Sequence, residues 1–323
     1  MYLFVKDHIT NKYNRIITTY LMKLINFFLL IAAYSLSAQQ KTDAGFNFPI
    51  SQPYFESGKG PVVAIDDAHY NFHTLHGRFA ALGKLLKNDG YMLQDFSSKL
   101  RRKKLDQVDV FVISNALSKR NGKGNWTLPT PSAFSGEEIN ELNQWVKDGG
   151  RLLLIADHMP MAGAIADLAA SFGISFENAY ALDQRKRPLE FFTKKDGTLL
   201  NNVVTSDQSP FKNVDSIVTF TGSAFKISQK SIPVLILDKQ YKLVYPDTAS
   251  KFHETTRSIS GEGFYQLALM EYGKGKIVVS GEAAMFSAQL AGPHKKKLGF
   301  NNPGAHQNCQ LILNLFHWLT EKK

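Results

Sequence analysis

The sequence predicts an α/β fold, with a flavodoxin-like parallel sheet covered by helices on both faces and additional antiparallel strands toward the C-terminus. Two observations lead to this prediction. Apolar runs of strand length alternate with stretches of helical periodicity in the order β-α-β-β-α-β-α, which is typical of a parallel sheet. Four of the apolar runs also end in polar clusters: Asp66-Asp67-Ala68-His69, Ser114-Asn115, Asp157-His158 and Gly281-Glu282. Because the carboxyl ends of parallel strands meet at one edge, we expect one ligand site there.

The first 38 residues have the organisation of a signal peptide. Lys23 provides a positive charge, residues 24–33 an apolar segment, and residues 35–38 the small side chains of a cleavage site. The apolar segment is short for a bilayer, so we expect cleavage, and no stable membrane span in the mature chain. The translation start is Met1 or Met22. The sequence therefore predicts a periplasmic or secreted protein.

The bulk composition is that of an ordinary globular protein, with 44% hydrophobic and 20% charged residues. Cys309 is the only cysteine, which rules out an intrachain disulfide. Residues 1–38 hold four Lys or Arg and one Asp, so about +7 of the formal net charge of +10 belongs to the rest. The basic runs accompany no nucleic-acid motif and are interpreted as solvated loop charge, so no nucleic-acid partner is expected.

The elements follow from local patterns. Residues 39–60 carry Pro, Gly and Ser without periodicity and are interpreted as a lead-in. Continuous apolar runs predict buried strands, and apolar stripes at helical spacing predict helices packed on the sheet. We expect strands at 61–66, 91–96, 109–114 and 151–156, and helices at 72–86 (capped by Asn71), 135–148 and 162–172.

One helix start has a strong signature. Ser135-Gly136-Glu137-Glu138 fits a capping box, in which Ser135 accepts from the Glu138 amide and Glu138 reaches back. Residues 115–134 precede it and are rich in Gly, Asn, Pro and Thr. A loop of this length is usually functional or disordered.

The remainder is strand-rich before it returns to the sheet. Alternating runs within residues 180–272 predict antiparallel strands that extend the sheet or form a flap. Residues 276–280 predict a core strand, and 307–319 a closing helix. We therefore interpret residues 61–323 as one domain with an insertion at about 180–272.

Histidine and carboxylate side chains follow the first strand. His69 and His73 are four residues apart and can share a face, and with Asp67 they offer ligands that suit zinc or another divalent metal. The spacing matches no strong metal motif. The alternative interpretation is that these Asp residues accept backbone amides before a helix.

The strongest catalytic candidates are Asp157 and His158, because they lie in a strand-to-helix turn. His158 can act as a general acid or base, with Asp157 orienting it or acting itself. Glu282 can orient a histidine or bind a ligand, and Asn115 and His306 are expected to bind substrate. The alternatives are structural: Asp157 caps a helix, and Glu282 is an acid favoured by a helix dipole.

Several common activities have no motif here. The sequence contains no P-loop, no Gly-x-Gly-x-x-Gly at the first helix and no Gly-x-Ser-x-Gly elbow. Nucleotide binding and serine-hydrolase chemistry are therefore disfavoured.

Three segments resemble the class I glutamine amidotransferase-like superfamily: residues 149–158, 275–282 and 314–319. The resemblance is to its non-catalytic and trehalose-utilisation-like branches, and it covers most of 60–180 and 265–320. The family's nucleophilic Cys would fall near Asp157, which implies that the chain is no thiolate-based glutaminase. Glu282 falls near the family's final His and Glu pair, which implies a site at the same place with altered chemistry.

Together these features predict an exported hydrolase-like enzyme. Its Asp, His and Glu groups would perform acid–base or metal-assisted chemistry on a small molecule, a carbohydrate or a cell-envelope substrate. The alternative is a non-catalytic binding or scaffold module of the envelope, with a decayed site.

Overall fold

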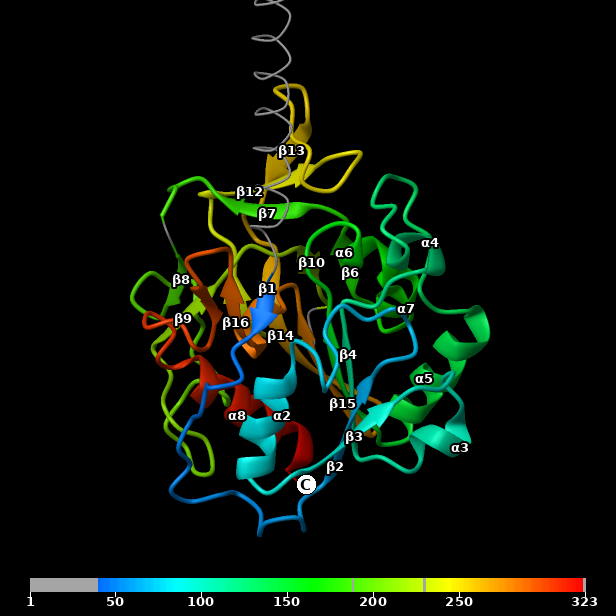
Figure 1. Ribbon diagram of the computed structural model, residues 1–323, viewed down its shortest axis with the longest axis vertical. Helices are drawn as coiled ribbons and strands as arrows, with labels where there is room; N and C mark the ends of the chain where they lie inside the picture. The colour runs from blue at the N-terminus through cyan, green and yellow to red at the C-terminus, as the bar shows by residue number, and fades with distance from the viewer. Residues whose placement is uncertain (1–39, 188, 229–230, 322–323) are drawn as a thin grey trace, which may run out of the picture. The chain divides into compact units, whose positions relative to one another are not determined.

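A computed structural model describes residues 40–187, 189–228 and 231–321, so the expected signal peptide lies outside the described residues. Figure 1 shows a twisted central sheet with helices on either side. Its nine strands run in the order β3-β2-β4-β5-β15-β14-β10-β6, and β11 also pairs with β14. The bounds of its strands are β2 Val62–Asp66, β3 Met92–Phe96, β4 Val110–Ser114, β5 Arg151–Ile155, β6 Ser175–Glu177, β10 Ala224–Lys226, β11 Ile232–Ile236, β14 Tyr265–Tyr272 and β15 Gly275–Ser280.

Five strands form the parallel part of this sheet. β2 lies between β3 and β4, β5 pairs with β4, and β15 pairs with β5, all in parallel. The order therefore reverses around β2, as in flavodoxin-like folds. β14 then pairs antiparallel with β15, and β10 and β11 pair antiparallel with β14. The predicted fold class, a parallel sheet with added antiparallel strands, is confirmed.

Alternating side chains of the parallel strands feed two hydrophobic cores. Val63, Ile65 and Leu153 belong to the core beneath α2 (Ala80–Asn88) and α8 (Asn308–Thr320). Ala64, Phe111 and Leu154 belong to the core beneath α5 (Gly136–Lys147) and α7 (Ala166–Ser171). Because both faces are covered, the strands are apolar without alternation, which is why the sequence revealed them.

The predicted helix ends are right in two places and wrong in two. α5 begins with the predicted capping box, and α8 matches the predicted closing helix. The helix after Asn71 begins only at Ala80, because Asn71 accepts the His69 amide and the Phe72 amide donates to the Asn115 carbonyl. The predicted 162–172 helix is divided into α6 (Met161–Ala164) and α7, interrupted at Ile165.

The segment 180–272 forms small sheets as well as extending the central one. β7 and β13 flank β12, and β8 pairs with β9. Their bounds are β7 Tyr180–Asp183, β8 Glu190–Thr193, β9 Ser216–Thr219, β12 Tyr241–Tyr245 and β13 Arg257–Ser260. Of the two predicted alternatives, the extension of the sheet occurs in β10, β11 and β14, and the other strands form separate small sheets.

The remaining elements are short: α3 Arg102–Leu105, α4 Lys119–Gly122, the 3-10 helix η1 Ala284–Phe286, β1 Gln40–Thr42, β16 Ala288–Ala291 and β17 Lys296–Gly299. Residues 40–41 and 290–296 belong to a small unit of their own, and 42–289 with 297–321 form the large unit. No helix in the described ranges is both long and apolar enough to cross a membrane.

Candidate functional site

The carboxyl ends of β2, β4, β5 and β15 lie along one edge of the sheet, and polar residues follow each of them. Asn115 connects three of the loops at this edge. Its side-chain oxygen accepts from the Asp157 amide at 2.8 Å, and its side-chain nitrogen lies 3.2 Å from Nδ1 of His73. Asn115 is buried and has a φ of +54°, a left-handed conformation that asparagine adopts more readily than most residues. It therefore acts here through fixed hydrogen bonds within the protein.

His158 is held in a defined orientation after β5. Its Nδ1 lies 2.8 Å from the Met159 carbonyl, which fixes the proton on Nδ1 and leaves a lone pair on Nε2. The imidazole stacks on Tyr180 with ring centroids 4.1 Å apart and planes 12° apart. The His158 amide also donates to the Asp157 carboxylate at 2.9 Å. Both residues are partly exposed.

Glu282 follows β15, the strand that pairs with β5, and is fully buried. Its carboxylate oxygens accept the amides of Ala284 and Met285 at 2.8 and 2.7 Å. Burial, and secondarily the nearby Asp157 carboxylate, raise the pKa of Glu282 well above its ordinary value. The backbone amides oppose this shift without cancelling it. Glu282 thus caps the η1 turn.

Glu190 of β8 is a half-buried carboxyl group that was not found from the sequence. Burial, and then Asp183, raise its pKa to about 7, and Glu190 in turn contributes to the raised pKa of Glu282. The strand-rich segment therefore supplies an acidic group near the edge of the parallel sheet. No sequence signal identified it, because Glu190 follows no core strand.

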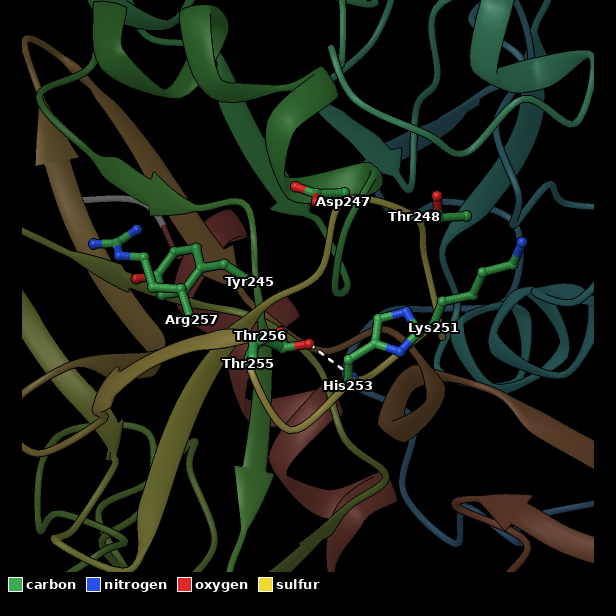
Figure 2. A pocket seen from close by; sticks show the side chains of 8 residues that line it. All are labelled: Tyr245, Asp247, Thr248, Lys251, His253, Thr255, Thr256 and Arg257. Carbon is green, nitrogen blue, oxygen red and sulfur yellow. Dashed lines mark hydrogen bonds between the residues drawn. The ribbon is translucent and has the colours of Figure 1, made fainter.

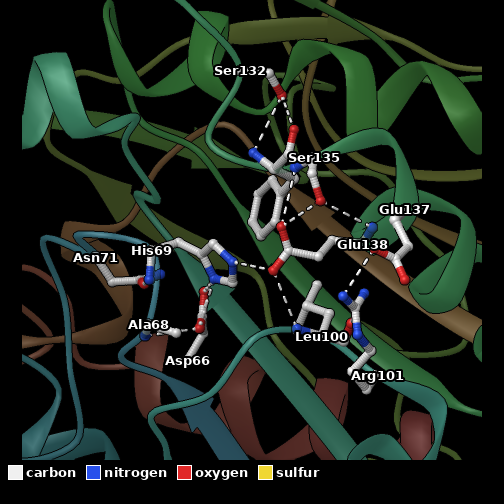
Figure 3. A network of polar contacts seen from close by, with 11 residues as sticks. Asp66, Ala68, His69, Asn71, Leu100, Arg101, Ser132, Ser135, Glu137 and Glu138 are labelled. Atoms are coloured by element: carbon white, nitrogen blue, oxygen red, sulfur yellow. Dashed lines mark hydrogen bonds and ion pairs between the residues drawn. The ribbon is translucent and has the colours of Figure 1, made fainter.

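His69 belongs to a different network, shown in Figure 3. Its Nδ1 lies 2.9 Å from an Asp66 oxygen, and its Nε2 lies 3.2 Å from Glu138 of α5. All three side chains are buried. The two carboxylates outweigh the effect of burial and raise the pKa of His69. Glu138 also bonds Ser135, and its pKa falls to about 2. The network holds the loop after β2 to the start of α5.

The side chains predicted as metal ligands do not form a ligand set. Carboxylates take both ring nitrogens of His69, Asp67 is exposed, and the Asn115 amide takes Nδ1 of His73. Throughout the described parts of the chain, no group of three or more His, Cys, Asp or Glu side chains is arranged to hold a metal ion. The residues present therefore do not fit the predicted zinc site.

Arg78 is a residue of this edge that the sequence analysis missed. Its guanidinium lies 3.8 Å above the ring of Phe72 and is partly buried. Its positive charge is attracted to Asp157. Burial, and secondarily the charge of Arg78, lower the pKa of His73 to about 3. No sequence signal distinguished it, because Lys84 is also charged within 72–86.

His306 lies apart from this cluster. It is an exposed residue of the loop before α8, and no hydrogen bond or ring contact joins it to another predicted site residue in the described chain. The structure thus brings together Asn115, His73, Asp157, His158 and Glu282, places His69 in a separate network, and leaves Asp67 and His306 exposed.

The loop between β12 and β13 adjoins His158 through aromatic contacts. Tyr180, which stacks on His158, contacts Phe252 edge-on at 5.1 Å and bonds Ser250 through its hydroxyl. Phe252 is 45% exposed. The same loop encloses a cavity of about 300 Å³, shown in Figure 2. The side chains that line it are Tyr245, Asp247, Thr248, Lys251, His253, Thr255, Thr256 and Arg257.

The fold and the strand-end cluster define the class as an α/β protein with a flavodoxin-like sheet. No family model matches the chain, and no curated protein matches it. Solved structures do. The mmIFT52 N-terminal domain has a TM-score of 0.56 and 15% identity, over 81% of this chain and 98% of that domain. At that identity the similarity is one of fold alone.

Two further solved structures have lower TM-scores. A cytoplasmic protein from Salmonella typhimurium has a TM-score of 0.47 and 13% identity, over 81% of this chain and 100% of its own. A ThuA-like protein from Bacteroides uniformis has a TM-score of 0.42 and 13% identity, over 86% of this chain and 96% of its own.

Proposed function

We propose that the chain is an exported hydrolase of amidotransferase-like fold, which uses His158 and Asp157 for acid–base chemistry on a carbohydrate of the cell envelope. One observation carries the proposal. His158 is fixed at the carboxyl end of β5 in a single tautomer, and Nε2 has no hydrogen-bond partner among the described residues. Histidine is the side chain that most often exchanges protons in catalysis near neutral pH.

The proposed reaction assigns one role to each group. Nε2 of His158 accepts a proton from water as the water oxygen bonds to the substrate, and the resulting imidazolium returns the proton to the leaving oxygen. The Asp157 carboxylate stabilises the imidazolium electrostatically. Glu282 is a positioning residue: its oxygens accept the amides of Ala284 and Met285 and so hold the turn after β15 in place. No step passes through a metal.

The carbohydrate part of the proposal rests on the aromatic side chains beside His158. Tyr180 and the exposed Phe252 offer apolar faces next to polar groups. Sugar rings present C–H faces together with hydroxyl groups, and they suit such a surface. The export part rests on the order of charge, apolar segment and small residues in 1–38.

The test is turnover on glycoside, ester, amide and phosphoester panels. His158→Ala should lower kcat about a hundred- to ten-thousand-fold with an unchanged circular dichroism spectrum. Asp157→Asn should also lower kcat. The matched control is His294→Ala, which removes an exposed histidine from the turn between β16 and β17. Full activity in both His158→Ala and Asp157→Asn would show the assignment to be wrong.

A non-catalytic envelope binding module is the second candidate. It is favoured by the backbone amides that occupy both oxygens of Glu282, as expected of a structural cap. A wild-type protein without turnover on any panel, whose glycan binding depends on Tyr180 and Phe252 and survives His158→Ala, would favour it.

A further inference from the structure

Arg78 carries a positive charge that none of the described residues pairs. Its guanidinium stacks on Phe72 at 3.8 Å, and Phe72 in turn contacts Trp126 edge-on. In the described chain the guanidinium makes no hydrogen bond and no ion pair. Asp157 attracts it from a distance. A partly buried guanidinium with five unused donors is costly unless an acceptor reaches it, because burial removes part of its hydration.

His73 holds a second unused donor. The backbone amide of Asp157 donates to the side-chain oxygen of Asn115, which fixes the orientation of the Asn115 amide group. The side-chain nitrogen of Asn115 therefore faces His73 and donates to its Nδ1. His73 must then carry its proton on Nε2. This atom is buried and has no hydrogen-bond partner among residues 40–187, 189–228 and 231–321. Arg78 and His73 both contact Phe72: the guanidinium lies 3.8 Å from the centroid of the Phe72 ring, and the centroid of the His73 ring lies 5.9 Å from it. The two unpaired donors therefore flank one aromatic side chain.

We propose that Arg78 and His73 bind an oxyanionic group of the ligand, a carboxylate, phosphate or sulfate. A guanidinium offers two parallel N–H donors to such a group. Because the Arg78 side chain already stacks on Phe72, it has little rotamer freedom left to lose when an anion binds, so the entropy cost of binding is small. The inference deepens the proposed function, on which it rests for the site and the substrate class. The substrate is then an acidic carbohydrate, anchored on the loop after β2 while His158 acts from the turn after β5.

The experiment measures anion binding directly, apart from turnover. The purified full chain is titrated with inorganic phosphate, with sulfate and with glucuronate by calorimetry at constant ionic strength, and glucose is the uncharged control for glucuronate. Wild type should bind the anions, and glucuronate should bind more tightly than glucose. Arg78→Met should weaken anion binding at least about tenfold. Arg78→Lys should weaken it by less, because lysine keeps the positive charge but lacks the two parallel N–H donors of the guanidinium.

The matched control is Arg257→Met. Arg257 also stacks on an aromatic ring, Tyr245 at 4.3 Å, but it lines the cavity of the β12–β13 loop. Anion binding that Arg257→Met removes and Arg78→Met retains would overturn the proposal, as would a wild type that binds none of the three anions.

Thermal melting keeps the test valid if Arg78→Met changes the fold. Without added anions its Tm should equal or exceed that of wild type, because an unpaired, partly buried charge has been removed. Phosphate should raise the Tm of wild type and leave that of Arg78→Met unchanged. An equal rise in both would contradict the proposal.

Discussion

Asn115 shows how one residue fixes the geometry of the site. Its left-handed backbone reverses the chain after β4, and its amide group orients both the Asp157 turn and the ring of His73. A hydrophobic or β-branched residue would strain the backbone and supply neither hydrogen bond. Asn115 was predicted to bind substrate, and its observed partners are within the protein.

The two functions of Asn115 can be separated by substitution. Asn115→Gly keeps the left-handed backbone and loses both side-chain bonds, so it should lower the free energy of unfolding by about 1–3 kcal/mol. Asn115→Ala loses the same bonds and adds backbone strain, so it should cost about 1 kcal/mol more. Urea unfolding measures both values. Equal values for the two variants would show that the left-handed backbone is not strained in alanine.

At the scale of elements, buried polar contacts hold the loops in place over the sheet edge. Glu138 closes the capping box of α5 and also accepts from His69 and from the Leu100 amide. The first turn of α5 is therefore joined to the loops after β2 and β3. Glu137, the preceding residue, is exposed and pairs only with Arg101 at the surface.

Glu138→Gln should therefore destabilise the protein by about 2–4 kcal/mol at pH 7, because it leaves a buried His69 with one carboxylate fewer. Glu138 has a pKa lowered to about 2, from 4.5. Its stabilisation is thus present above about pH 4.5 and lost as the pH falls toward 2, and the difference from wild type should shrink over that range. His69 also has a raised pKa. The difference in stability between wild type and Glu138→Gln should therefore also decline as the pH rises through the pKa of His69, because His69 then loses its positive charge.

Glu137→Gln is the matched control for these urea or thermal unfolding measurements. An exposed pair contributes little, so its effect should stay below about 0.5 kcal/mol. If Glu137→Gln and Glu138→Gln lowered the free energy of unfolding by similar amounts, the buried bonds of Glu138 to His69 and Leu100 would not stabilise the protein.

The sequence predicted correctly those elements whose structure depends on the local pattern of residues. The predictions were wrong where the structure depends on contacts between residues far apart in the chain. The strands at 62–66, 110–114 and 151–155 are apolar because helices cover both faces, and this is visible in the sequence. The late start of α2 depends on the bond between Phe72 and Asn115, which no local pattern reveals. The approach of Arg78 and Glu190 to the strand ends depends on tertiary packing in the same way.

At the scale of the whole molecule, the parallel sheet supplies the site and the segment 180–272 supplies its surroundings. The loop of 115–134 and the β12–β13 loop are joined by the Thr127–Thr248 bridge and by the bond from the Leu128 amide to Asp247. Two long insertions thus support each other beside His158. Neither loop needs to be rigid on its own.

The proposed export makes a prediction about the whole chain. Protein recovered from the native host should begin near Ala38 or Gln39, because residues 35–38 have the small side chains that signal peptidases require. Intact-mass measurement and N-terminal sequencing of fractionated cells would test this. A chain that begins at Met1 or Met22 in the cytosolic fraction would contradict export.

The pairing of β5 with β15 has a consequence for how the chain folds. These neighbours are separated by residues 156–274, so during synthesis the apolar edge of β5 stays unpaired until nearly the whole chain has been made. Contacts between distant segments form slowly, and an open strand edge invites pairing with other chains. A chain truncated before residue 275 would keep this edge open and would tend to aggregate. The same delay would keep a newly made chain unfolded for longer, which is the state in which a polypeptide can pass through a narrow channel.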